Sequence, residues 1–231
     1  MKKYTVIVLA LVLSWNAFAK EDNKKDKSGI GFIGGMVLST AGFPEEGASA
    51  QKNRYKLGGF GGLCYERQFG KVVAFELQAM YADLGVHSKY TLLGNEGSSI
   101  QNFHAVQLPI NLKFYVVKQF NIYVGGYGQY MFALISHTVI KNASGDVIKD
   151  ERSKNLLKDD TYNPTDANGH HYLMPWDAGV QGGVEYISKM GLGVGARFQK
   201  GLIDITNNKF ALDDGKWVTN TSLQIYLVGH F

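Results

Sequence analysis

The chain has 231 residues, including 28 glycines, 13 tyrosines and 13 phenylalanines, and its mean hydropathy is -0.13. This composition is too polar for a bundle of membrane helices and too aromatic for a disordered chain. Because Cys64 is the single cysteine, an internal disulfide and a cysteine-based zinc cluster are excluded. The formal charge of +4 comes without the clustered basic residues that indicate nucleic-acid binding.

Residues 1–19 have the features of a secretory signal peptide. A positively charged start precedes an apolar run from Tyr4 to Trp15, and Ala17–Ala19 forms a small-x-small cleavage site. The apolar run is shorter than the roughly 20 residues of a spanning helix, so we expect a cleaved leader rather than a membrane anchor. Residues 20–28 follow as a polar lead-in, and residues 29–231 form one predicted domain.

From Gly29 onward, apolar and polar residues alternate with a period of two, which predicts strands. Eight segments show this pattern. They are Gly29–Thr40, Arg54–Gln68, Lys71–Gly85, Gln101–Val117, Phe120–Leu134, Tyr172–Ile187, Met190–Ile203 and Trp217–Phe231. These segments are longer than soluble strands usually are, and they suit tilted strands that cross a bilayer.

The connections between these segments alternate strictly between short and long. Three links of two residues alternate with four longer loops, which begin at Ala41, Val86, Ile135 and Asp204. This alternation predicts an all-β fold, an eight-stranded antiparallel up-and-down transmembrane β-barrel. A soluble barrel with apolar side chains inside is the alternative. The leader, the strand length and the terminal aromatic Phe231 favour the membrane form.

In the membrane form the apolar face of each strand points outward and carries no charge, because Lys or Arg at mid-bilayer costs about 2–4 kcal/mol. The polar face then points inward, where enclosed charges must be paired. The predicted interior network consists of Glu66, Glu76, Gln107, Lys113, Asp177, Gln181, Glu185, Arg197 and Gln224. An eight-stranded barrel is just wide enough for side chains to fill, so we predict a packed interior; a narrow solute path is the alternative.

Two contacts within this network follow from the expected registers. If the sixth and seventh strands turn at Ser188-Lys189, Gln181 lies opposite Arg197. Glu76 and Lys113 are expected at similar heights on neighbouring strands. Pro109 lies within the fourth strand, where it removes a ladder hydrogen bond, and we expect a bulge there.

Three stretches carry a family resemblance. They are the glycine-rich Gly58–Tyr65 with the following Glu76, Leu77 and Tyr81; Val106–Tyr115 (VQLPINLKFY); and Ala196–Leu202 (ARFQKGL). With them, the chain resembles the small outer-membrane β-barrel proteins of Bacteroidota, a porin family that includes PorT-like proteins. The resemblance implies a fold and a location in the outer membrane of a Gram-negative bacterium after signal-peptide cleavage. It does not imply one activity.

The same resemblance implies two partners: the lipid of the outer membrane and the barrel-assembly machinery. The closing strand carries the expected assembly signal, formed by Leu223, Ile225, Leu227 and Phe231.

The sequence gives only weak evidence for catalytic groups. His87-Ser88 and Ser136-His137 lie at loop edges, but neither matches a motif of the outer-membrane lipid-modifying enzymes or proteases. Neighbouring residues of an extended segment point to opposite faces, so His170 and His171 are poorly placed to share a metal. We therefore expect no enzymatic activity, no metal and no cofactor, and Cys64 is interpreted as a small packing residue.

The function expected from the sequence is that of a small, non-enzymatic outer-membrane barrel with a packed polar interior. Its role is structural or surface-binding, through long extracellular loops. The loop at residues 135–171 is rich in Lys, Asp and Asn, and it is either a recognition surface for an extracellular ligand or a solvated shield. The alternatives are a porin-like passive solute channel and a PorT-like accessory to protein secretion, with a secretion partner.

Overall fold

The computed structural model describes residues 29–41, 52–92, 95–153, 155–159, 163–165, 171, 173–206 and 218–231. The predicted signal peptide and lead-in, His170 and Trp217 lie outside these residues. Within the described part of the chain, no helix is long and apolar enough to cross a lipid bilayer.

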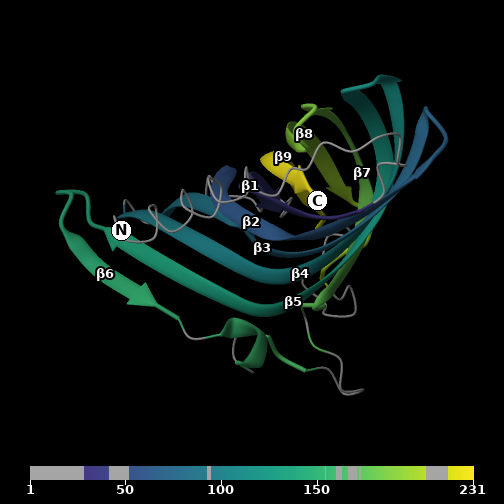
Figure 1. Ribbon diagram of the computed structural model, residues 1–231. Helices are drawn as coiled ribbons and strands as arrows, with labels where there is room; N and C mark the ends of the chain where they lie inside the picture. Colours follow the sequence, from purple (N-terminus) through teal and green to yellow (C-terminus); the bar gives the residue numbers. More distant parts are fainter. Residues whose placement is uncertain are drawn as a thin grey trace.

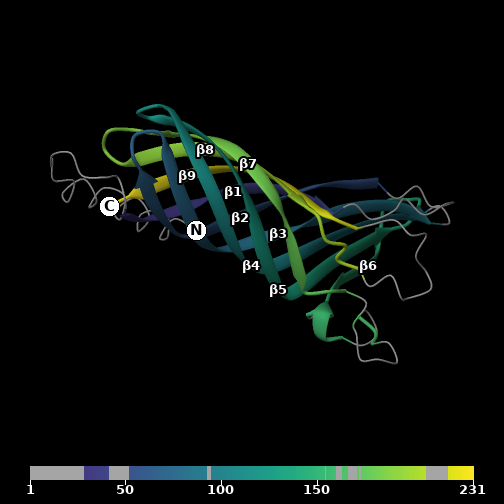
Figure 2. The ribbon, with the colours of Figure 1, turned by 90° about the vertical axis from the view of Figure 1, so that its right-hand side faces the viewer.

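Eight antiparallel strands close into a ring, and a ninth extends one side of it (Figures 1 and 2). The strands are β1 (Gly29–Ala41), β2 (Lys52–Phe69), β3 (Val73–Leu92), β4 (Asn95–Val117), β5 (Phe120–Lys141), β6 (Val147–Arg152), β7 (Trp176–Ile187), β8 (Leu192–Gly201) and β9 (Asn220–His230). The sheet order is β4-β3-β2-β1-β9-β8-β7-β5-β6, and pairing of β4 with β5 closes the ring. The predicted eight-stranded up-and-down barrel is confirmed, with β6 as an addition.

The outer surface of the barrel is apolar over a limited height. Along β3, the outward residues from Val73 to Tyr81 are apolar, and from Asp83 onward they become polar. This height matches the roughly 9–11 residues that a spanning strand needs. At its edge the rings of Tyr81, His104 and Phe132 lie together, with Tyr81 and His104 centroids 6.1 Å apart. Aromatic residues at such an edge are typical of a membrane interface.

Beyond this apolar height, β3, β4 and β5 continue and are joined by β6 (Figure 1). We call this part the outer sheet: residues 83–92, 95–104, 133–141 and β6. It corrects two expected loops. The segment after Val86 is a hairpin in which His87 pairs with Ile100, and the loop after Ile135 contains the end of β5, all of β6 and a short 3-10 helix, η2 (Leu156–Lys158).

The outer sheet escaped prediction because its outward face is largely polar and its inward face is apolar only near the barrel, where Leu84, Val86 and Phe103 are buried. Farther from the barrel the inward positions carry hydroxyl groups, and Ser99 Oγ lies 3.1 Å from both Ser136 Oγ and Thr138 Oγ1. Backbone pairing continues there without the apolar alternation that identifies a half-buried strand.

Two further expectations about register are wrong. The β7–β8 turn occupies residues 188–191, with Gly191 at a φ of +81°, instead of the expected two residues. Pro109 pairs with Tyr127 without a bulge, and β3 keeps one register on either side of it. There the β3–β4 pairing skips Gln78 and Ala79, so a local gap in the ladder accommodates the missing N–H of proline.

Candidate functional site

The barrel interior brings the predicted polar residues together. All nine side chains are buried, none of them more than 5% exposed. Apolar side chains of the same strands point outward, as Leu77, Leu108 and Phe198 do. A soluble barrel would have the reverse arrangement. Leu223, Ile225, Leu227 and Phe231 of the predicted assembly signal also point outward and are exposed.

Lys113 lies at the centre of a group of three carboxylates, which we call the lysine cluster: Lys113, Glu66, Glu76 and Glu185. The Lys113 ammonium is 3.0 Å from Glu66 Oε2 and 2.7 Å from Glu185 Oε1, and it donates a hydrogen bond to each. It is also 2.5 Å from Glu76 Oε2, outside hydrogen-bond geometry. Glu76 and Lys113 thus meet across neighbouring strands.

Hydroxyl and amide groups complete the lysine cluster. The Tyr115 hydroxyl donates to Glu66 Oε1 at 2.5 Å, and the Tyr226 hydroxyl donates to Glu185 Oε2 at 3.1 Å. Asn111 and Gln78 both donate to Glu76 Oε1. Because a buried carboxylate is costly without such partners, these groups allow the charges to remain inside the barrel.

Arg197 forms the next layer. Its guanidinium donates to Gln78 Oε1 at 2.7 Å and, through Nε, to Gln224 Oε1 at 3.0 Å. It also lies 5.6 Å from the ring centroids of Phe60 and Tyr226, in cation–π geometry. The two rings and two amides hold the arginine across the barrel, where it occupies space that a solute path would need.

Amides and one carboxylate fill the layers toward the outer sheet. Gln181 accepts from Gln199 at 2.7 Å, and the two residues are paired, whereas Arg197 lies opposite Gly183. The expected Gln181–Arg197 pairing is therefore wrong, because the longer β7–β8 turn shifts the register by two residues. Asp177 accepts from Asn220 at 2.8 Å and from Gln129 at 3.2 Å, and Gln129 in turn accepts from Gln107 at 2.7 Å.

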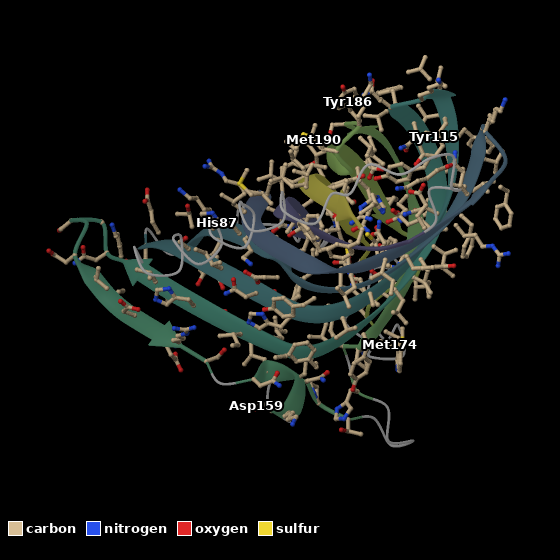
Figure 3. The ribbon with its side chains drawn as sticks, in the orientation of Figure 1. His87, Tyr115, Asp159, Met174, Tyr186 and Met190 are labelled. Carbon is tan, nitrogen blue, oxygen red and sulfur yellow. The ribbon has the colours of Figure 1, made fainter. Side chains whose placement is uncertain are left out.

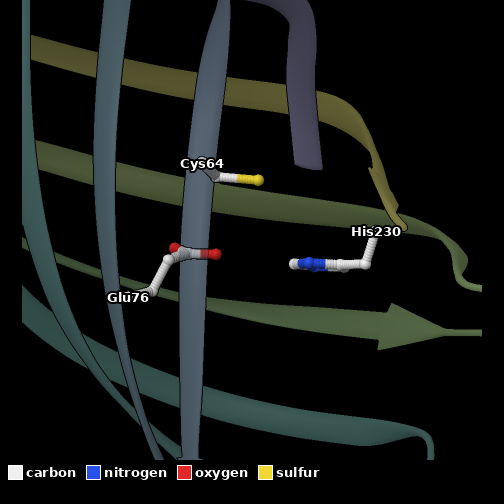
Figure 4. A group of neighbouring side chains, drawn as sticks. All are labelled: Cys64, Glu76 and His230. Carbon is white, nitrogen blue, oxygen red and sulfur yellow. The ribbon is translucent and has the colours of Figure 1, made fainter. Parts of the chain in front are cut away.

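Several members of the network were not identified from the sequence. Among them are Gln78, Tyr226 and Gln199, which lie two residues from Glu76, Gln224 and Arg197 respectively. Each of these three residues is predicted when the inward face of its strand is continued by a further two residues. His230 was missed for another reason: it meets Cys64 and Glu76 only through closure of the ring (Figure 4).

The turn end of the interior holds the groups with metal-binding chemistry. Ligand atoms of Cys64, Glu76 and His230 all lie within 4.8 Å of one another, as do those of Glu66, Glu185 and His230. Of the neighbouring histidines considered poorly placed to share a metal, His170 lies outside the described residues, and His171 bonds to Thr165 and to the Asn163 carbonyl.

The serine–histidine neighbours considered in the sequence do not bond to each other in the outer sheet. His87 Nε2 is 2.9 Å from Ser98 Oγ, and Ser88 donates instead to Asn53. His137 Nε2 is 2.8 Å from Asp150 Oδ1, an exposed pair on neighbouring strands. Figure 3 shows His87 on the outer sheet, away from Tyr186 and Met190 near the turn end.

A hollow of about 490 Å³ lies over β4 and β5, on the lipid-facing side of the wall. It is lined by apolar side chains such as Leu108, Ile110 and Val124, with Gly126 and Gly128 leaving space between them. Its lining also includes Asn111 and Tyr127, which donate hydrogen bonds to Glu76 and Asp177 of the interior network.

A family described as "Outer membrane protein beta-barrel domain" matches residues 18–207. Three solved structures are similar. Ail of Yersinia pestis, solved with the heparin analogue sucrose octasulfate, is 9% identical with a TM-score of 0.44, covering 88% of this chain and 99% of its own. Neisserial surface protein A is 12% identical with a TM-score of 0.43, covering 88% and 98%. OprG of Pseudomonas aeruginosa is 15% identical with a TM-score of 0.41, covering 91% and 99%. No curated protein sequence matches.

Proposed function

The chain belongs to the outer membrane protein beta-barrel domain family, and on that premise we propose that it is a surface-binding barrel of a Gram-negative outer membrane. In this proposal the packed interior makes the barrel a rigid anchor, and the outer sheet binds an extended protein segment. The observation that carries it is β6, which ends the sheet order and pairs only with β5 among the described strands.

The architecture supports an extracellular position for the outer sheet. Outer-membrane barrels have short turns on the periplasmic side and long connections outside. Here the connections of residues 70–72, 118–119 and 188–191 lie at one end, and the outer sheet extends from the other. The edge of β6 that pairs with no other described strand then faces the cell exterior.

The chemistry of β6 suits strand pairing better than binding of a polyanion. All six of its residues are exposed, including Val147 and Ile148. An unpaired edge offers a row of backbone donors and acceptors to an incoming strand. From Lys141 to Arg152 the hairpin carries three basic and three acidic residues, so it lacks the basic patch that a heparin-like ligand requires.

A peptide array tests this function. The refolded chain is applied to immobilised random decapeptides, and we expect it to retain a subset rich in β-branched residues. Replacing residues 138–151 with Asn-Gly removes the β6 edge and is expected to reduce capture at least about tenfold, as loss of the pairing strand implies. The control replaces residues 90–97 with Asn-Gly, which shortens the β3–β4 hairpin and leaves the edge intact.

Two outcomes would contradict this function: no peptide subset retained by the full chain, or the same subset retained without residues 138–151.

The porin-like channel and the PorT-like accessory role are the other predictions, as is membership of the Bacteroidota group. The interior packing argues against the channel, and secretion proteins that copurify with the barrel would favour the accessory role.

A further inference from the structure

We propose that the turn end of the barrel interior binds a divalent transition-metal ion of the Zn²⁺ class through Cys64, Glu76 and His230. Sulfur, oxygen and nitrogen atoms of these three residues lie within 4.8 Å of one another. Figure 4 shows the His230 ring pointing toward the Cys64 thiol and the Glu76 carboxylate, which come from three different strands.

A glycine of β1 makes this meeting possible. Gly31 pairs with Cys64 on β2 and with His230 on β9, so it lies between them. A Cβ on Gly31 would be 2.9 Å from Cys64 Sγ and 2.3 Å from the Gly229 carbonyl oxygen. Because Gly31 has no side chain, the thiol and the imidazole face each other across the strand that separates their backbones.

The imidazole that would bind the ion is left without hydrogen bonds. Both ring nitrogens of His230 are buried and have no hydrogen-bond partner among the described residues. Glu76 Oε2 also accepts no hydrogen bond there, although it lies 2.5 Å from the Lys113 ammonium. Glu76 itself is only 1% exposed. A buried donor or acceptor without a partner costs roughly 1–3 kcal/mol, and an ion bound by such a group removes that cost.

The charge of the layer also favours a dication. The lysine cluster holds three carboxylates and one ammonium in direct contact, an excess of two negative charges. The other buried cation nearby, Arg197, donates to Gln78 and Gln224 rather than to a carboxylate. A bound dication would neutralise an excess that is otherwise costly in a low-dielectric interior.

The donor set selects the kind of ion. Thiolate, imidazole and carboxylate are the ligands of Zn²⁺, whereas Mg²⁺ and Ca²⁺ prefer oxygen alone. Three protein ligands leave a fourth position for water or for a Glu66 oxygen, which lies 3.9 Å from His230 Nε2. Binding breaks the S–H bond of Cys64, and its proton passes to solvent as the sulfur–metal bond forms. The His230 side chain is 15% exposed, which gives the ion access from the turn side.

Cobalt titration tests the site, because Co²⁺ reports a thiolate ligand optically whereas Zn²⁺ is silent. The chain from Lys20 to Phe231, without an affinity tag, is refolded in detergent and titrated with Co²⁺. We expect a thiolate-to-cobalt charge-transfer band that saturates at one equivalent and disappears when Zn²⁺ is added. Cys64→Ser should abolish the band, and His230→Gln should weaken Co²⁺ affinity at least about tenfold.

His104→Gln is the matched control, because this histidine lies at the opposite edge of the apolar surface and should leave the titration unchanged. Refolding of each variant is checked by the heat-dependent gel shift. Absence of the band in the folded chain would overturn the site. Persistence of the band in folded Cys64→Ser, or unchanged affinity in folded His230→Gln, would overturn it equally. Peptide capture by the outer sheet does not depend on these results.

Discussion

Lys113 contacts three buried carboxylates at once. Removing one partner of a buried ion pair typically costs about 3–5 kcal/mol, because an uncompensated charge remains. We therefore expect Lys113→Met to lower the free energy of unfolding by about that amount. Urea unfolding of the refolded barrel in detergent, followed by loss of the folded gel band, measures it.

The control for this change is Lys149→Met. Lys149 is 2.7 Å from Glu151, but both side chains are more than half exposed. Such surface pairs contribute about 0–1 kcal/mol, so the control should unfold near the urea concentration of the unsubstituted chain. Equal midpoints for Lys113→Met and Lys149→Met would contradict the central role of the lysine cluster.

His87 in the outer sheet gives a pH dependence. Burial, and secondarily the charges of Lys89 and Arg54, lower the pKa of His87 below its ordinary 6.5. The folded sheet therefore favours neutral His87, and its contribution to stability is present above the unfolded-state pKa and lost as pH falls through the lowered one. We expect NMR titration to give a pKa below 6.5, and hydrogen-exchange protection of the β3–β4 hairpin to fall in acid.

The matched variant for this prediction is His87→Gln, which keeps a hydrogen-bonding group near Ser98 but does not titrate in this range. Its hairpin should keep the same protection at about pH 7.5 and about pH 5.5, on either side of the imidazole pKa. A His87 pKa at or above 6.5, or the same acid response in the variant, would contradict the assignment.

At the scale of elements, the β5–β6 hairpin depends on its turn. Asn142 Oδ1 accepts from the amides of Ser144 at 3.0 Å and Asp146 at 2.8 Å, and Gly145 adopts a φ of +89°. Asn142→Ala removes these two hydrogen bonds and a third, from Asn142 Nδ2 to Asp146 Oδ2 at 3.2 Å, each worth about 0.5–1.5 kcal/mol. We expect faster hydrogen exchange in β6 with no change in overall unfolding. Asn102→Ala, which loses one bond of 3.4 Å to the Ile135 carbonyl, should leave β6 unchanged.

Sequence alternation was sufficient to predict the strand segments that lie against lipid and insufficient to predict the segments that lie in water. In β3, apolar residues from Val73 to Tyr81 on one face identify the strand, because lipid and the polar interior demand opposite side chains. From Asp83 onward the outward residues are polar although Leu84 and Val86 remain buried inside, so the lipid-facing apolar pattern that identified the strand ends there. β6 has all six residues exposed and was missed for the same reason.

At the scale of the whole molecule, ring closure brings together residues that no local pattern relates. Lys113 and Glu185 are 72 positions apart, and Arg197 and Gln78 are 119 apart, yet both pairs are hydrogen-bonded. The inward face was predictable for each strand from its period of two. Predicting the contacts between strands required the strand registers as well. A turn two residues longer than expected was enough to change the partner of Gln181.

The filled interior leads to a prediction about conduction. The lysine cluster, the Arg197 layer and the amides around Gln199 form successive buried layers across an eight-stranded ring. Eight strands leave room for side chains and little else. We expect the refolded chain to insert into a planar bilayer without producing discrete current steps, with insertion verified separately by protease protection in vesicles.

Steady, discrete conductance would contradict this packing and would make Glu76, Lys113 and Arg197 pore-lining charges. A second measurement separates a true pore from a partly unfolded barrel. If current passes through the native interior, Arg197→Ala should increase the step size, because the guanidinium between Phe60 and Tyr226 occupies the centre of the ring. If current comes from damaged barrels, steps should instead become more frequent in urea while keeping a broad range of sizes, since unfolding creates no single pore.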